Sequence, residues 1–131
     1  LFFWAHWCPD CKTMGPLLDR MLTKYGPQGF TVMAPTQRYG YVAGGRNASA
    51  TEEMTYIAEV RDKAYPWMAK QGVPVSEKTH KEYGVSTTPT VVLVDRQGLI
   101  RLYNPGQMKE ETIEPLIRTL VTRGATGSKP E

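Results

Sequence analysis

The sequence contains few cysteines: only Cys8 and Cys11 occur among its 131 residues. A small scaffold held together by disulfides needs more cysteines at wider spacing, so that class is excluded. A closed zinc site needs four ligands. The chain has no second CxxC motif to supply them, although His6, His80 or carboxylates could complete such a site. The two cysteines therefore need a local explanation.

Long apolar runs are also absent. The longest ones, such as residues 90–94, have the length of a strand and fall far short of the roughly 18 residues that indicate a membrane span. The first residue is Leu1 rather than Met and lies within an apolar stretch, so we expect the native chain to begin further upstream. We expect contact with a membrane only through an anchor in that upstream segment.

No cluster of one charge sign occurs either. The 16 Lys and Arg against 13 Asp and Glu leave a net charge of +3 that is scattered along the chain, so no nucleic-acid partner is expected. The composition, with 40% hydrophobic and 22% charged residues, is that of an ordinary globular protein. The length suits one domain, which we place at residues 1–124, followed by a flexible tail at residues 125–131.

Hydrophobic patterns predict an α/β domain with the order βα-β-α-α-ββ-α. Residues 1–5 form a continuous apolar run, and a helical pattern follows it and leads to a second apolar run over residues 30–34. This βαβ order predicts two parallel strands joined by a right-handed crossover. The loop that bears Cys8 should then lie at the same edge of the sheet as residues 37–41.

The rest of the chain carries signals for three helices and a β-hairpin. Ser49 and Glu52 match a capping box that starts a helix, and Gly84 is placed to end a short helix in a left-handed conformation. Two apolar runs flank a turn of the Asp-x-x-Gly type, which predicts an antiparallel hairpin. The expected elements are helices over residues 49–65, 77–83 and 113–121, an extended piece over residues 72–75, and strands over residues 90–94 and 99–103.

The motif Cys8-Pro9-Asp10-Cys11 lies where the first predicted strand meets its helix. Cys8 falls near the N-cap, where unpaired backbone N–H groups and the positive end of the helix dipole lower the pKa of a thiol and favour an exposed thiolate. Pro9 at the first helical position loses no hydrogen bond and stiffens the turn. Closing so short a loop would stabilise the fold by only about 2 kcal/mol, so we predict a reactive pair rather than a structural one.

Two segments resemble the thioredoxin superfamily. The segment FWAHWCPDCK at residues 3–12, followed by Pro16 and Leu18-Asp19, is similar to the active-site strand and helix of that family. The segment GVSTTPT at residues 84–90 resembles its second signature, in which a cis-proline lies across from the cysteine pair. The resemblance extends to about residue 121 and implies a thioredoxin-like fold, in which a central mixed sheet has helices on both faces.

By this resemblance the chain is a thiol:disulfide oxidoreductase without a bound cofactor. Its partners would be protein disulfides or dithiols and an upstream thiol that donates electrons. Cys8 would attack a substrate disulfide and Cys11 would resolve the mixed disulfide. The Thr88–Pro89 bond would be cis and would leave the backbone of Thr88 free to pair with an extended substrate segment. The substrate-binding residues so implied are Trp7, Pro9, Thr88 and Pro89.

Residues 37–84 hold one more helix and one more extended piece than thioredoxins carry before the cis-proline. This insertion is similar to TlpA-like and ResA-like thioredoxins, which are usually tethered on the extracytoplasmic side of a membrane and reduce disulfides there. The resemblance therefore implies a reductant that is periplasmic or anchored to a membrane. The Pro9-Asp10 pair also occurs in a small cytosolic thioredoxin-related family, so a cytoplasmic location stays open.

Two acidic positions of the family are apolar in this chain. Phe2 replaces a buried acid, and Met14 replaces a glutamate three residues after the second cysteine. Resolution by Cys11 is then either slow or assisted by Asp10, Glu77 or a water. The open alternatives to a reductant are a disulfide oxidant or isomerase, a module that binds copper or zinc through the cysteine pair, and a non-catalytic interaction domain.

Three polar side chains need separate interpretation. His6, close to the motif, is expected to face solvent, with a positive charge beside Cys8 as the alternative role. His80 lies in a polar helix, where we also expect it to face solvent. Asp10 in the first helical turn is expected to stabilise the helix, and its charge would oppose formation of a thiolate.

Aromatic residues cluster near the motif. Trp4 is expected to pack in the core, whereas Trp7, adjacent to Cys8, is expected to form part of a flat apolar contact surface. The Tyr39-Gly40-Tyr41 segment should overlook the cysteines and is a candidate for partner recognition.

Overall fold

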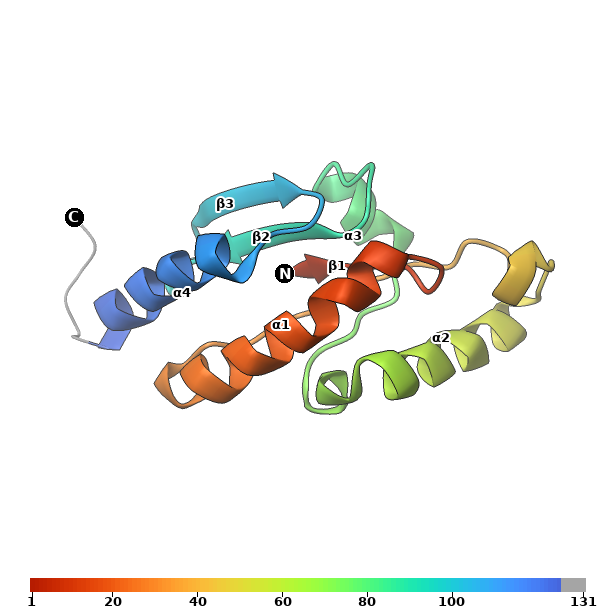
Figure 1. Ribbon diagram of the computed structural model, residues 1–131. Coiled ribbons are helices and arrows are strands. Elements are labelled where there is room, and N and C mark those ends of the chain that lie inside the picture. Colours follow the sequence, from red (N-terminus) through yellow and green to blue (C-terminus); the bar gives the residue numbers. More distant parts are fainter. Residues whose placement is uncertain (126–131) are drawn as a thin grey trace.

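The computed structural model describes residues 1–125, and within them three regular strands form a sheet in the order β1, β2, β3 (Figure 1). Strand β1 (Phe2–Phe3) pairs with β2 (Thr90–Val94), and β2 pairs with β3 (Ile100–Pro105), both antiparallel. The apolar, β-branched sequence of β2 suits this central position, where four of its five residues are buried. The Asp95 N–H donates to the Leu99 carbonyl at 2.9 Å, so the predicted hairpin between β2 and β3 is confirmed.

Two extended segments continue the sheet beyond β1. The N–H groups of Phe2 and Trp4 donate to the carbonyls of Met33 (2.8 Å) and Pro35 (3.1 Å), which is a parallel pairing, and residues 72–75 pair in parallel with residues 33–36. The sheet is therefore mixed, as predicted. The strand predicted over residues 30–34 is displaced toward the C-terminus, because the residues that pair are 33–36. Pro35, the residue expected to end the strand, lacks an N–H group, but its carbonyl accepts a hydrogen bond from Trp4 and so continues the pairing.

Four α-helices surround the sheet in the described residues (Figure 1). The predicted capping box is confirmed: the Glu52 N–H donates to Ser49 Oγ at 3.2 Å, and the Ser49 N–H donates to Glu52 Oε1 at 3.1 Å. Gly84 has a φ of +65°, as predicted for a residue that ends a helix. The helices are α1 (Pro9–Tyr25), α2 (Ala50–Ala64), α3 (Glu77–Glu82) and α4 (Glu110–Ala125).

None of the helices in residues 1–125 is long and apolar enough to cross a membrane. Helix α4 reaches residue 125, and the rest of the tail predicted at residues 125–131 lies outside the described residues.

The two phenylalanines of β1 point to opposite faces of the sheet, as successive strand residues do. Phe2 packs against Tyr65 and Trp67 beyond the end of α2, with ring centroids 6.3 and 6.4 Å apart, and joins the core formed with α1 and α4. Phe3 packs against His80 of α3 at 5.1 Å. Helices therefore cover both faces, which confirms the predicted fold class.

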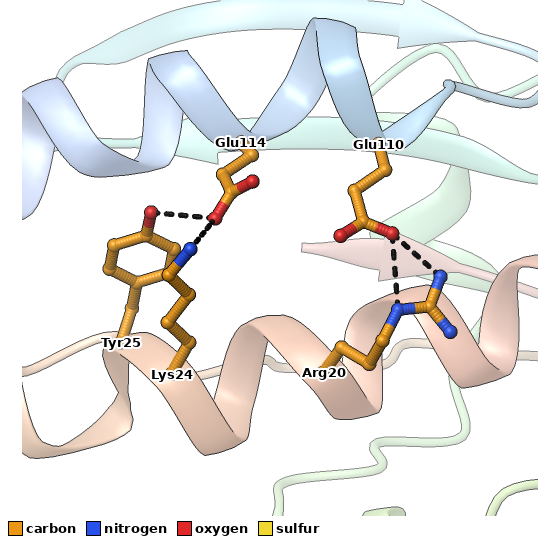
Figure 2. Close-up of polar contacts among 5 residues, drawn as sticks. All are labelled: Arg20, Lys24, Tyr25, Glu110 and Glu114. Carbon is orange, nitrogen blue, oxygen red and sulfur yellow. Dashed lines mark hydrogen bonds and ion pairs between the residues drawn. The ribbon is translucent and has the colours of Figure 1, made fainter.

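Helices α1 and α4 lie side by side and are joined by two ion pairs (Figure 2). The Arg20 guanidinium lies 2.7 Å from Glu110, and the Lys24 ammonium lies 2.6 Å from Glu114, which also accepts a hydrogen bond from Tyr25 at 2.8 Å. Exposed ion pairs of this kind stabilise a fold little. The apolar core between the two helices therefore holds α1 more firmly than these pairs do.

His80 does not face solvent, so that prediction is wrong. The residue is 3% exposed, and its ring contacts Phe3 edge to face. Neither ring nitrogen has a hydrogen-bond partner among the described residues. The backbone of Ser76 works to raise the pKa of His80, but less strongly than burial lowers it. The reason is that α3 is short and covers the second face of β1, so one of its side chains has to pack against the sheet even though its sequence is polar.

Acid is expected to destabilise the fold through His80. Burial lowers the pKa of this imidazole below its ordinary value of 6.5. Below pH 6.5 the unfolded chain then binds more protons at this residue than the folded chain, so the free energy of unfolding falls as the pH drops. Urea denaturation at pH 7.5 and pH 5.0 measures this difference.

The His80→Phe variant is the matched control for acid sensitivity, because it keeps an aromatic ring beside Phe3 but cannot bind a proton. Its free energy of unfolding should change less between pH 7.5 and pH 5.0 than that of the wild type. The same dependence in both proteins would contradict the prediction.

Candidate active site

Cys8 and Cys11 form a disulfide at the start of α1, with Cα atoms 5.3 Å apart. Cys8 is the N-cap and Pro9 the first helical residue, as predicted. The Sγ atom of Cys8 accepts a hydrogen bond from the backbone N–H of Cys11 at 3.1 Å. In the reduced protein this N–H group and the positive end of the helix would stabilise a negative charge on Cys8, which is the chemistry of a nucleophilic thiolate.

Both cysteines are buried in this disulfide form. Cys8 is 2% exposed and Cys11 is 0% exposed. The Sγ atom of Cys8 turns back over the first turn of α1, where it bonds to the buried Cys11. The exposed thiolate expected at Cys8 belongs to the reduced protein and stays a prediction. Access of another sulfur to Cys8 therefore depends on how the neighbouring segments are held.

The residues on either side of Cys8 are exposed. Trp7 is 46% exposed, and Pro9 and Asp10 also face solvent. The ring of Trp7 meets that of the half-buried Tyr39 edge to face, with an interplanar angle of 76° and centroids 5.5 Å apart. The segment over residues 37–41 thus lies beside the active-site loop, as predicted. We call Trp7 and Tyr39 the aromatic platform.

The residues that precede β2 lie at the same end of the sheet. The Thr88–Pro89 peptide bond is cis. Because Phe3 pairs with Thr90 in the antiparallel ladder, Pro89 lies at the end of β1 that leads into the loop with Cys8. Figure 1 shows the start of β2 beside the start of α1. Pro89 is buried, and the half-buried Thr88 has an Oγ1 atom without a hydrogen-bond partner among the described residues.

Apolar side chains occupy the two positions where the thioredoxin superfamily carries acids. Phe2 and Met14 are 1% and 2% exposed and belong to the core. Of the proposed substitutes, Asp10 is exposed in the first turn of α1. Glu77 lies 2.7 Å from Lys81, whose hydrogen bond and charge lower the pKa of the Glu77 carboxyl. A base that assists Cys11 stays a prediction.

His6 is buried, so the prediction that it faces solvent is wrong. It is 1% exposed, and its Nε2 lies 3.1 Å from Oε2 of Glu53, which is also 1% exposed. A carboxylate only accepts hydrogen bonds, so Nε2 of His6 carries the hydrogen. The physical reason for burial is this partner, which α2 brings to the active-site loop from 47 residues away.

Glu53 also binds the segment that carries Tyr39, one of the two residues of the aromatic platform. Its Oε2 accepts the N–H of Tyr39 at 2.5 Å, and its Oε1 accepts the N–H of Gly40 at 2.9 Å. Burial works to raise the pKa of Glu53, but these two N–H donors and the contact with His6 outweigh it and lower the pKa below its ordinary value of 4.5. The carboxylate is therefore charged near neutral pH.

Sequence reasoning missed Glu53 altogether. The signal that could have found it is helical spacing, because position 53 lies on the same face of α2 as the buried Ile57 and Val60. A carboxylate on a buried helix face needs a partner. The spacing alone does not say that the partner is His6.

The arrangement of potential metal ligands bears on the alternative of a copper or zinc module. In residues 1–125 no group of three or more His, Cys, Asp and Glu side chains is arranged to hold a metal ion. The two cysteines bond to each other, and His6 is engaged with Glu53.

Comparison with known proteins agrees with this geometry. The model of the thioredoxin-like domain family matches residues 1–120. The thiol:disulfide interchange protein DsbE of Xylella fastidiosa is 25% identical over 114 residues, which cover 87% of this chain and 50% of that protein. The thiol-disulfide oxidoreductase ResA of Halalkalibacterium halodurans is 23% identical over 123 residues, which cover 92% of this chain and 60% of that protein. The chain thus spans about half the length of the first of these relatives.

Solved structures show the same fold. A protein described as the thiol:disulfide interchange protein DsbE of Chlorobium tepidum superposes with a TM-score of 0.68 at 29% identity, over 92% of this chain and 77% of that chain. The exposed lipoprotein thioredoxin Etrx1 of Streptococcus pneumoniae gives a TM-score of 0.61 at 24% identity, over 91% and 82%.

Proposed function

Because the chain belongs to the thioredoxin-like domain family, we propose that it is a thiol:disulfide oxidoreductase that reduces disulfides of other proteins. One observation carries the proposal: Cys8 and Cys11 form a disulfide in which Cys8 is the N-cap of α1. The exchange needs only these two sulfurs, so the proposal includes no cofactor. The names of the relatives DsbE and ResA support the reaction class.

The proposed reaction starts from the dithiol form. The Cys8 thiolate attacks one sulfur of the substrate disulfide and expels the other as a thiolate, which takes up a proton. Cys11 then loses its proton and attacks Sγ of Cys8, which releases the first substrate sulfur as a thiolate that is protonated in turn. Two electrons and two protons pass to the substrate, and the Cys8–Cys11 disulfide forms. An upstream thiol donor returns the pair to the dithiol form.

We assign substrate contact to residues on both sides of Cys8. Trp7 and Pro9 are exposed next to it and offer apolar surface. An extended polypeptide laid along the backbone of Thr88 would form main-chain hydrogen bonds beside Pro89, in the manner of an added strand. The partners would therefore be proteins with accessible disulfides.

We assign the protein to the extracytoplasmic side of a membrane. The support is the likeness to an exposed lipoprotein thioredoxin and to relatives named DsbE and ResA, together with the additional helix α2 between the second extended segment and Pro89.

The couple formed by Cys8 and Cys11 is expected to be reducing. The negative charge of Asp10 opposes a thiolate on Cys8 and so destabilises the dithiol form, which lowers the reduction potential. We expect a value nearer the thioredoxin value of about −270 mV than the DsbA value of about −120 mV. Equilibration in glutathione buffers, followed by alkylation and separation of the two forms, measures this potential.

The Asp10→Asn variant is the control for the potential, and its value should be higher because the opposing charge is gone. A wild-type potential above about −180 mV, the level of protein disulfide isomerase, would contradict a reductant and favour the oxidant or isomerase alternative.

A further inference from the structure

A buried hydrogen bond between His6 and Glu53 joins three segments around the active site. Glu53 belongs to α2, His6 lies in the loop between β1 and α1, and the N–H donors of Tyr39 and Gly40 lie in the segment after Thr36. Both side chains are 1% exposed. The buried carboxylate of Glu53 needs hydrogen-bond donors, and all of the donors named here come from the other two segments, so a shift of either segment would leave its charge poorly compensated.

Aromatic rings pack around His6 from the same segments. The rings of Tyr39, Tyr41 and Tyr56 meet the imidazole edge to face, with centroids 5.7, 5.6 and 5.1 Å away. Tyr39 also contacts Trp7. The orientation of His6, the position of the Tyr39 backbone and the seating of the exposed Trp7 are therefore parts of one packed unit.

We propose that the His6–Glu53 pair is a positioning device that holds the aromatic platform in place for the polypeptide that carries the substrate disulfide. The inference rests on the proposed function and adds residues outside the cysteine motif to it. His6 and Glu53 act through Tyr39 and Trp7 on substrate binding, and they do not take part in the exchange between sulfurs.

The two kinds of substrate differ in their need for the platform. The platform offers flat apolar surface next to Cys8, which suits an apolar or aromatic side chain near the cystine of a protein substrate. A small aliphatic disulfide, such as hydroxyethyl disulfide, has no flanking polypeptide to place there. A loosened platform should therefore weaken binding of protein substrates and leave the reaction with the small disulfide unchanged.

The Glu53→Gln variant tests the proposal directly. Glutamine has nearly the same shape, but its NH₂ group would face an N–H donor at Tyr39 or Gly40 and its charge is lost. With insulin as substrate and dithiothreitol as donor, we expect KM to rise roughly tenfold at unchanged kcat, the effect of losing one charge-assisted hydrogen bond. The rate with hydroxyethyl disulfide should stay within roughly twofold of the wild-type rate.

Two further comparisons separate positioning from a general loss of structure. Glu52→Gln changes the neighbouring, exposed carboxylate of the same helix, and glutamine also fits the capping box with Ser49, so neither rate should change. His6→Gln keeps an N–H donor for Glu53, so its KM for insulin should stay close to the wild-type value. His6→Ala removes the donor, so its KM for insulin should rise as in Glu53→Gln.

Several outcomes would overturn the proposal. An unchanged KM for insulin in Glu53→Gln, or an equal loss of rate with both substrates, would rule out a positioning role while leaving the proposed function intact. A wild-type protein that reduces neither substrate would overturn the proposed function and the positioning role together.

If Glu53→Gln does not fold, amide hydrogen exchange of the wild-type protein tests the positioning role instead. The Tyr39 and Gly40 amides bonded to Glu53 should exchange at least roughly tenfold more slowly than the amide of the exposed Gly44, after correction for intrinsic rates. Equal exchange would show that the pair does not hold the segment.

Discussion

Replacing Cys11 with serine is expected to trap the protein on its substrate. The Cys8 thiolate can still attack a disulfide, but no second sulfur remains to resolve the mixed disulfide, so this adduct accumulates and turnover of insulin falls to the uncatalysed rate. The adduct should form through Cys8, because Cys8 is the N-cap of α1 and Cys11 is 0% exposed. Mass spectrometry of non-reduced Cys11→Ser after incubation with insulin measures the adduct, which dithiothreitol should remove.

The Cys8→Ser variant is the matched control for this trap. It keeps one thiol at Cys11, enclosed by the core, so we expect neither an adduct nor turnover. An adduct in Cys8→Ser as abundant as in Cys11→Ser would show that the roles of the two sulfurs are wrongly assigned. Equal turnover of insulin by Cys8→Ser and the wild type would point instead to a non-catalytic domain.

Features that depend on neighbouring residues could be predicted from the sequence. The N-cap position of Cys8, the capping box at Ser49 and the left-handed Gly84 each follow from a few adjacent side chains and their hydrogen bonds. The hairpin between β2 and β3 follows in the same way from its turn. The N-cap at Cys8 also marks the start of α1, which is why the position of the cysteine pair in the fold could be predicted.

Features that depend on distant partners could not be predicted. The residues around His6 predict a surface position, because the partner that allows its burial, Glu53 of α2, lies 47 residues away in the sequence. A local pattern does not report a contact over that separation. His80 belongs to a polar helix, and its burial follows from the need to cover the second face of β1. The burial of Cys8 likewise depends on the direction its sulfur takes toward Cys11 rather than on residue type.

Replacing Trp4 with alanine is expected to cause the largest loss of stability among the tryptophans close to the site. Trp4 is 0% exposed, its ring contacts Tyr65 at 5.1 Å, and its indole N–H donates to the Ala34 carbonyl at 2.9 Å. Truncating such a side chain lowers the free energy of unfolding by about 3–5 kcal/mol, a large share of the roughly 5–15 kcal/mol that holds a domain together. Urea denaturation followed by circular dichroism measures this loss.

Trp7→Ala is the control for this prediction, because it removes the same ring three residues away. Trp7 is 46% exposed and contacts Tyr39 on one edge, so its truncation should lower the free energy of unfolding by less than about 1 kcal/mol. Its effect should instead fall on KM for insulin, because the aromatic platform loses one of its two rings. Equal losses of stability in the two variants would contradict the assignment of Trp4 to the stability of the core and of Trp7 to substrate binding.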